Sequence, residues 1–204
     1  MAAKLLISTA YLPPVEYFSL VSDADVIFIE KEENYIKQSY RNRCYLLSAH
    51  GPQPLSVPVY LGSLHKTLIK DIRIDYSKRW QQVHLGAMIA SYNSSPYFEF
   101  YFDDIEKIII KNHQFLLDLN MALTEKILEI LKIKKSLSFS PVFEPIENKT
   151  YDFRYKITPK RKSSFKQKPY MQVFNNGKGF IPHLSIVDLI FNMGPEAGEE
   201  LKGR

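Results

Sequence analysis

The 204-residue chain contains a single cysteine, Cys44. One cysteine cannot form an internal disulfide or a cysteine cage for zinc, so the sequence excludes disulfide-stapled domains and Cys-based zinc domains. Cys44 precedes the apolar residues 45–47, and we expect a buried, inert thiol rather than a nucleophile. A low cysteine content is typical of a reducing compartment, so we expect a cytoplasmic protein.

Long hydrophobic runs are also missing. The N-terminal apolar stretch ends before Tyr11 and the Pro13-Pro14 pair, which makes it too short for a signal-peptide core or a membrane span. We therefore expect no membrane-spanning segment.

The common cofactor and metal motifs are absent from the sequence. It contains no Gly-x-Gly-x-x-Gly, no Gly-Lys-Ser/Thr and no His-Glu-x-x-His. The histidines are scattered along the chain, and we expect His84 to be packed or hydrogen-bonded inside the protein rather than to act as a catalytic base. No cofactor, metal site or catalytic residue is predicted.

Acidic residues are missing from the long stretch between Asp152 and Asp188. The basic residues in that stretch are Arg154, Lys156, Lys160, Arg161, Lys162, Lys166, Lys168 and Lys178, and the whole chain carries a net charge of +5. Pro159 and the Ser163-Ser164 pair favour a flexible basic loop at 154–168. This loop is either simply solvated or an anion-binding segment, in which Phe153, Tyr155 and Phe165 would stack on nucleic-acid bases.

The N-terminal residues have the pattern of a strand, a helix and a second strand. A compact apolar run at 4–9 ends at prolines, and a second run follows at 26–29. Between them Pro14 can open a helix whose apolar face comprises Val15, Phe18 and Val21. This βαβ unit predicts a parallel pair of strands, with ligands near their carboxyl ends at residues 8–13 and 30–35.

A hairpin and a short strand are expected next. Residues 36–48 read as one extended strand, which a turn of four or five residues around 50–54 joins to a second strand at 55–59. Alternating isoleucines predict another short strand at 69–74.

Three amphipathic helices follow, and their expected buried stripes are Trp80, Val83, Ala87 and Ala90; Phe98, Phe102, Ile105 and Ile109; and Leu116, Leu119, Leu123, Ile127 and Ile130. Strands are expected at 136–143 and 170–174, and a last helix at 186–192 between Ser185 as N-cap and the stop signal Gly194-Pro195. The prediction is a single α/β domain spanning 1–204, with a mixed sheet that begins with a βαβ unit, a hairpin and a layer of about four helices.

Arg41, Asn42 and Arg43 form the sharpest candidate site. On a strand the two arginines would share one face and could hold a phosphate or carboxylate together. Alternatively, one arginine pairs with an internal acid such as Asp25 or Asp75 and ties elements together. Asp188, which stands between apolar neighbours, needs a partner, and we expect Arg41 or Arg43 in that role.

Several blocks of sequence follow one another along the chain, namely Tyr11-Leu12-Pro13, Ala24-Asp25, Gln38-Ser39-Tyr40-Arg41-Asn42-Arg43, Leu55-Ser56-Val57-Pro58-Val59, Lys70-Asp71-Ile72-Arg73-Ile74, Ser91-Tyr92-Asn93-Ser94-Ser95-Pro96-Tyr97-Phe98, and the block from Leu184 to Pro195. In this order they resemble the WbqC-like protein family, in a branch like the one common in Bacteroidetes. The resemblance implies a role in surface-polysaccharide (O-antigen-like, lipopolysaccharide) biosynthesis. The expected activity is that of a transferase that moves an acyl or aminoacyl group onto an activated sugar.

This enzyme hypothesis predicts a pocket for an anionic small molecule such as a nucleotide sugar or an acyl donor. The candidate binding residues are Tyr11, Gln38, Arg41, Asn42, Arg43, Tyr92, Tyr170, Gln172 and Asp188. Two alternatives stay open: a phosphate- or nucleic-acid-binding module that uses the basic residues 154–168, and a non-catalytic structural protein.

Overall fold

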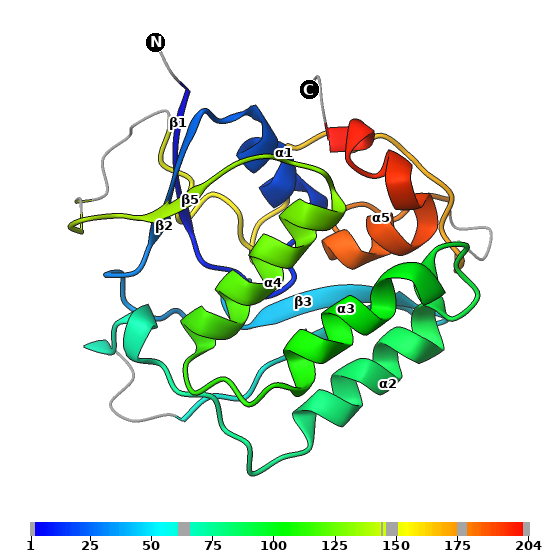
Figure 1. Cartoon of the computed structure of the whole chain (residues 1–204), viewed down its shortest axis with the longest axis horizontal. Coiled ribbons are helices and arrows are strands. Elements are labelled where there is room, and N and C mark those ends of the chain that lie inside the picture. The colour runs from blue at the N-terminus through cyan, green and yellow to red at the C-terminus, as the bar shows by residue number, and fades with distance from the viewer. Residues whose placement is uncertain (1–2, 61–65, 144, 146–150, 175–178, 202–204) are drawn as a thin grey trace.

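The computed structural model describes residues 3–60, 66–143, 145, 151–174 and 179–201. It contains a three-stranded parallel sheet. Its strands are β1 (Lys4–Ser8), β2 (Val26–Glu30) and β5 (Leu137–Phe139), in the order β1-β2-β5. Helix α1 (Val15–Asp23) connects β1 to β2 (Figure 1). The expected βαβ unit is therefore confirmed, and so is the mixed α/β class.

The predicted buried face of α1 is also confirmed. Val15, Phe18 and Val21 are all buried, because they recur at helical spacing on the side that faces the core, where α1 contacts α5. Pro14 precedes the helix in an extended conformation, as expected of a residue that cannot donate a backbone hydrogen bond.

The second sheet is a two-stranded antiparallel hairpin of β3 (Arg43–Ser48) and β4 (Gly51–Ser56). Its loop consists of residues 49–50 alone, so the expected loop of four or five residues was wrong. Pro52 and Pro54 lie inside β4, opposite Leu47 and Tyr45. They are tolerated there because β4 pairs with β3 alone in the described chain, and an edge strand can present proline nitrogens to the outside.

The start of the hairpin also differs from the prediction. The chain at 36–42 is not a strand: Gln38 has a φ of +56°, and the Ser39 hydroxyl donates a hydrogen bond of 2.6 Å to the backbone oxygen of Ile36. A left-handed residue and a local side-chain bond of this kind form a turn. Arg41 and Asn42 therefore belong to this turn and not to a strand. Contrary to our expectation, the side chains of Arg41, Asn42 and Arg43 do not alternate between the two faces of a strand.

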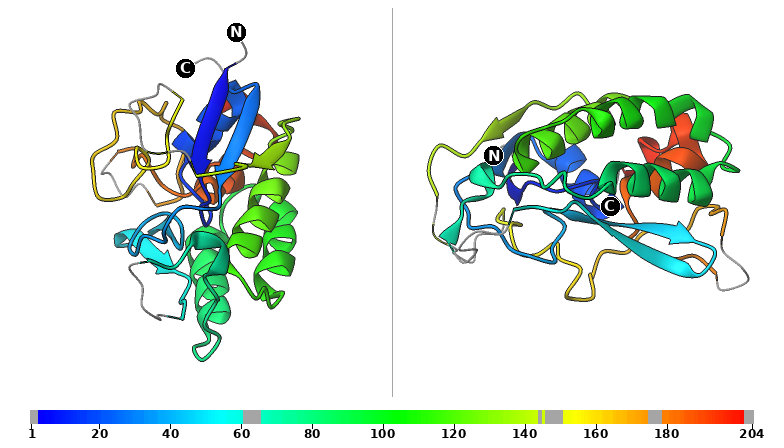
Figure 2. Two further views of the ribbon diagram at one scale, coloured as in Figure 1. Left: turned by 90° about the vertical axis from the view of Figure 1, so that its left-hand side faces the viewer. Right: turned by 90° about the horizontal axis from the view of Figure 1, so that it is seen from below.

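Five α-helices occur in the described chain, the others being α2 (Trp80–Tyr92), α3 (Phe98–Ile110), α4 (Leu116–Ile130) and α5 (Ile186–Met193). In both views of Figure 2, α2, α3 and α4 lie on one side of the molecule, and the segment 151–174 lies on the opposite side. The predicted stripe of α3 is buried throughout, and that of α4 is buried except for the partly exposed Ile130. None of these helices is long and apolar enough to cross a membrane, as far as the described residues show.

The buried face of α2 was predicted wrongly. Val83 is 61% exposed and Ala90 is exposed, whereas the helix buries Trp80, His84, Leu85, Met88, Ser91 and Tyr92. The prediction failed because it assumed that the apolar Val83, and not its polar neighbour His84, faces the interior. The buried residue is the polar His84, which has a hydrogen-bond partner in the interior.

Two further expected strands take other forms. Residues 69–71 form a short 3-10 helix (Ile69–Asp71), after which Arg73 and Ile74 make only isolated bridges. Residues 170–172 have no regular secondary structure and residues 173–174 form a turn, so the expected strand at 170–174 was wrong. The last helix agrees with prediction, since Ser185 Oγ accepts a hydrogen bond from the Val187 amide and Gly194 ends the helix with a φ of +53°.

Candidate ligand cavity and buried polar clusters

A cavity of about 740 Å³ opens between the hairpin and the start of α2. Three segments build it, namely the turn before β3, the chain from Pro54 to Tyr60, and the residues that lead into α2. The lining residues are Tyr35, Lys37, Gln38, Asn42, Arg43, Pro54, Leu55, Ser56, Val57, Pro58, Val59, Tyr60, Asp75, Lys78, Arg79, Trp80, Val83 and His84.

Positive charge dominates the polar part of this lining. It contains Lys37, Arg43, Lys78 and Arg79 but only one carboxylate, Asp75. Arg43 Nε donates a hydrogen bond of 2.9 Å to Ser56 Oγ, which holds its side chain along the hairpin. Among the residues that the structure describes, no carboxylate lies within 4.0 Å of any of these four cations. The cavity can therefore attract an anion.

Aromatic rings form much of the remaining wall. Tyr35, Tyr60 and Trp80 all line the cavity. Trp80 is only 4% exposed and is fixed by its neighbours, with ring centroids 6.5 Å from Tyr11 and 6.0 Å from Tyr76. Rigid rings of this kind suit a ligand with a flat or apolar part.

His84, which lines the cavity, forms a buried pair with Tyr11 behind it. The Tyr11 hydroxyl lies 2.8 Å from His84 Nδ1. Burial lowers the pKa of His84 to about 4, although its hydrogen bond to the Ser56 backbone opposes this effect. His84 is therefore neutral at pH 7, and it is packed and hydrogen-bonded as its sequence context predicted.

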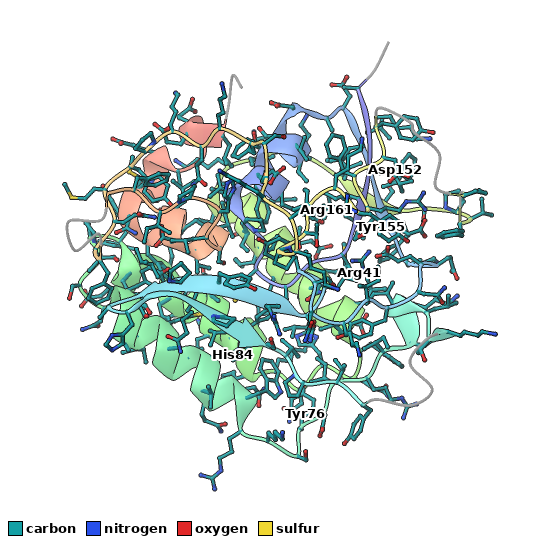
Figure 3. All side chains as sticks on the ribbon, turned by 180° about the vertical axis from the view of Figure 1, so that it is seen from behind. Arg41, Tyr76, His84, Asp152, Tyr155 and Arg161 are labelled. Atoms are coloured by element: carbon teal, nitrogen blue, oxygen red, sulfur yellow. The ribbon has the colours of Figure 1, made fainter. Side chains whose placement is uncertain are left out.

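Arg41 does not line this cavity. Its Nε and Nη2 donate to the two carboxylate oxygens of Glu33 at 2.8 and 2.5 Å, and Nη2 also lies 2.8 Å from Ser8 Oγ. Arg41 thus pairs with an internal acid, but with Glu33 rather than with Asp25 or Asp75. In Figure 3 Arg41 lies near Tyr155, whereas His84 and Tyr76 lie in a different part of the molecule.

Arg154 fills the neighbouring interior. Its guanidinium contacts Glu30 at 3.0 Å and Asp152 at 2.6 Å, and Glu30 also accepts a 2.7 Å hydrogen bond from Ser140. Burial raises the pKa of Asp152, but the hydrogen bonds and charge of Arg154 outweigh it, so that pKa is lowered. We had expected a ligand near the carboxyl ends of β1 and β2, but these ion pairs fill that position.

Asp188 lies at the centre of a separate polar cluster. The buried carboxylate accepts hydrogen bonds from Tyr170 Oη at 2.6 Å and from Gln172 Nε2 at 2.9 Å. Burial raises its pKa, while Tyr170, Gln172 and Tyr92 lower it. The expected partner, Arg41 or Arg43, was wrong: the donors are neutral side chains that tie the 170–172 segment to α5.

The structure thus distributes the predicted site residues over several places. Gln38, Asn42 and Arg43 line the cavity, Tyr11 lies behind its wall, and Arg41 belongs to the ion pairs at the carboxyl ends of β1 and β2. The other predicted residues, Tyr92, Tyr170, Gln172 and Asp188, gather around α5.

Sequence reasoning missed most of the cavity's charged and aromatic residues, namely Tyr35, Lys37, Tyr60, Asp75, Lys78, Arg79 and Trp80. One local signal could have found some of them. Two cations and the only tryptophan of the chain stand side by side at 78–80, where a helix begins.

The basic segment presents its aromatic rings inward. Phe153 and Phe165 are partly buried against the core, and Tyr155 lies under the Arg41 guanidinium at 5.5 Å from the ring centroid. Its remaining cations, such as Lys160 and Arg161, are exposed. In the part of the chain that the structure describes, no three His, Cys, Asp or Glu side chains are grouped as metal ligands.

Comparison with known proteins gives one family and one relative. Residues 9–164 match the family model described as the WbqC-like protein family. The chain is 26% identical over 228 residues to the "Uncharacterized protein Rv1507c" of Mycobacterium tuberculosis (strain ATCC 25618 / H37Rv), an alignment that covers 99% of this chain and 98% of that protein. No solved structure matches the chain.

Proposed function

The chain belongs to the WbqC-like protein family, and from this premise we propose that it is a transferase of surface-polysaccharide biosynthesis that binds an activated sugar in the cavity between the hairpin and α2. The transferred group would be an acyl or aminoacyl group. One observation carries the proposal: four cations line a cavity with aromatic walls, and none of them has a carboxylate within 4.0 Å among the residues that the structure describes. Membership of a Bacteroidetes-type branch stays a prediction.

The charge arrangement suits a diphosphate. Arg43 approaches from the hairpin, while Lys78 and Arg79 approach from the start of α2. A guanidinium can donate two parallel hydrogen bonds to phosphate oxygens, and a lysine adds a mobile positive charge. Cations on two sides of one cavity can hold a phosphate chain at both ends.

The size and the walls suit the rest of a nucleotide sugar. A cavity of about 740 Å³ falls within the range of roughly 300–1,000 Å³ that small-molecule sites occupy. The exposed ring of Tyr60 offers a surface for a base, and the largely buried rings of Tyr35 and Trp80 form the apolar wall behind it.

Asp75 adds an acceptor for hydroxyl groups. Its Oδ1 accepts a 2.8 Å hydrogen bond from the Ser77 amide, and this bond lowers the pKa of Asp75. The carboxylate is therefore ionised at neutral pH and can accept hydrogen bonds from the hydroxyls of a ribose or sugar.

The nucleic-acid alternative has less support. It needs exposed rings beside the basic residues, but Phe153 and Phe165 pack against the core and Tyr155 stacks under Arg41. The non-catalytic alternative predicts no specific ligand for the cavity, so a binding experiment separates it from the transferase.

A thermal-shift experiment with UDP-glucose and matched variants tests the proposal. We expect UDP-glucose to raise the melting temperature of the wild-type chain, and uridine, which lacks phosphates, to have a much smaller effect. The double variant Lys78→Gln/Arg79→Gln should lose most of the shift, whereas Lys134→Gln, which removes an exposed charge four residues after the end of α4, should keep it. Equal shifts for UDP-glucose in both variants would contradict the proposal.

A further inference from the structure

A second, smaller cavity of about 270 Å³ lies beside the first one. The hairpin contributes Tyr45 and Pro52 to its wall, the turn before the hairpin contributes Tyr40, and the basic segment contributes Arg161 and Lys162. The cavity thus lies where the basic segment meets the hairpin.

Cross-strand pairing places the two cavities side by side. Tyr45 of β3 is directly opposite Pro54 of β4. Side chains of such a pair lie on the same face of a sheet, at about 5 Å between their Cα atoms. Tyr45 lines the small cavity and Pro54 lines the large one, so directly paired residues of the hairpin contribute to the walls of both cavities. Arg43, two residues before Tyr45 on the same strand, faces the large cavity from that side.

The wall of the small cavity combines a flat apolar part with a positive part. The rings of Tyr40 and Tyr45 are packed edge to face, with centroids 6.2 Å apart, and burial raises the pKa of Tyr40 well above its usual value. Arg161 and Lys162 are exposed, and neither has a carboxylate within 4.0 Å among the residues described.

The acidic residue of this wall is already engaged. Glu16 accepts a hydrogen bond of 2.8 Å from Ser163 Oγ, and burial raises the pKa of its carboxyl group. Glu16 is therefore less readily ionised than an exposed glutamate, and it neutralises the positive charges of Arg161 and Lys162 less than an ordinary carboxylate would.

We propose that this small cavity binds a second small molecule, which has a carboxylate or phosphate group attached to a flat or apolar body. The anionic group would lie against Arg161 and Lys162, and the body against Tyr40, Tyr45 and Pro52. This inference rests on the proposed function, because a transferase must hold two reactants next to each other. The hairpin of β3 and β4 would then form a wall of both binding cavities.

Binding of phenyl phosphate to the full-length chain tests this inference, with benzoate as the carboxylate counterpart. We expect saturation-transfer NMR to detect phenyl phosphate and isothermal titration to give its affinity. Loss of a charge-assisted hydrogen bond typically weakens binding about tenfold. The variant Arg161→Gln/Lys162→Gln should therefore bind phenyl phosphate about tenfold more weakly, and the exposed neighbour variant Lys160→Gln should bind it as the wild type does.

Trp80 distinguishes the two cavities, because it is the only tryptophan and lines the large one. Quenching of Trp80 fluorescence by UDP-glucose should be unchanged in Arg161→Gln/Lys162→Gln, and phenyl phosphate should not compete with UDP-glucose. Undiminished phenyl phosphate binding in that variant, competition with UDP-glucose, or no phenyl phosphate binding to the wild type would overturn the second site. Failure of UDP-glucose to bind while phenyl phosphate binds at Arg161 and Lys162 would instead count against the proposed function alone.

Discussion

Arg41 and Glu33 form a two-point ion pair in the interior, with Nε–Oε1 and Nη2–Oε2 distances of 2.8 and 2.5 Å. The Glu33 side chain is fully buried and that of Arg41 is 5% exposed. The same guanidinium contacts Ser8 at the end of β1 and the backbone oxygen of Arg154. One side chain therefore joins the ends of β1 and β2, the turn before the hairpin and the basic segment.

Removing one member of this pair should lower the free energy of unfolding substantially. Arg41→Ala leaves the Glu33 carboxylate buried without its partner, and loss of one member of a buried pair costs about 3–5 kcal/mol. Urea denaturation measures this loss. Lys70→Ala, which removes the part-exposed pair between Lys70 and Glu32, is the matched control and should change stability far less. Equal effects of the two substitutions would show that the Arg41 pair is not structural.

Arg154 should be equally important, although it belongs to the basic segment. Arg154→Met leaves Glu30 and Asp152 unpaired in the interior, and we expect a loss of about 3–5 kcal/mol in the free energy of unfolding. Limited proteolysis should also cut the variant near residue 154 faster than the wild type. Lys156→Met, at an exposed position two residues later, should behave like the wild type.

Low pH should reduce the stabilisation that the ion pair of Arg154 with Asp152 provides. The folded-state pKa of Asp152 is lowered by Arg154, so its contribution to stability is complete above the unfolded pKa of about 4 and is lost as the pH falls through the folded value. Asp152→Asn should therefore reduce the slope of stability against pH below about pH 4. An unchanged slope in urea titrations between pH 2 and 5 would contradict this role.

Asp188 should have the opposite pH dependence. Burial raises its folded-state pKa, so its contribution to stability is complete below the unfolded pKa of about 4 and is lost as the pH rises through the folded value. The wild type should thus lose stability relative to Asp188→Asn as the pH rises from about 4 towards 7. A stability difference that does not vary with pH in this window would show that the carboxyl group has its ordinary pKa.

Cys44 provides a simple probe of the hairpin core. It is fully buried in β3, and burial raises the pKa of its thiol well above the usual value. A disulfide reagent such as DTNB should therefore react with the native chain only at the rate of its opening, and rapidly in denaturant. Fast reaction of the native chain would mean that the hairpin does not cover the core as described.

Local sequence signals predicted the elements whose stability depends on neighbours within a few residues. The stripe Phe98, Phe102, Ile105 and Ile109 and the Ser185 cap are of this kind, and both were confirmed. The hairpin was less predictable, because Pro52 and Pro54 fit a strand only when its outer edge stays unpaired, which depends on the whole fold.

The candidate site depends on contacts between distant residues, and the sequence could not show them. Arg41 and Arg43 are two residues apart, yet one pairs with Glu33 and the other faces the cavity, because the turn at Gln38 removes the strand alternation. Arg154 looked like part of a solvated loop, since one of its two acidic partners, Glu30, is 124 residues away and only the fold brings it to the Arg154–Asp152 pair. The cavity itself is assembled from three separate segments of the chain.

Titration of Trp80 fluorescence with UDP-glucose tests the central claim most directly. The proposal predicts saturable quenching that weakens as salt is raised, because Arg43, Lys78 and Arg79 bind the phosphates, and little quenching by uridine. The variant Arg43→Gln should bind UDP-glucose about tenfold more weakly without loss of fold. Absence of quenching, or quenching that is equal for uridine and independent of salt and of Arg43, would contradict an anion-binding cavity at this place.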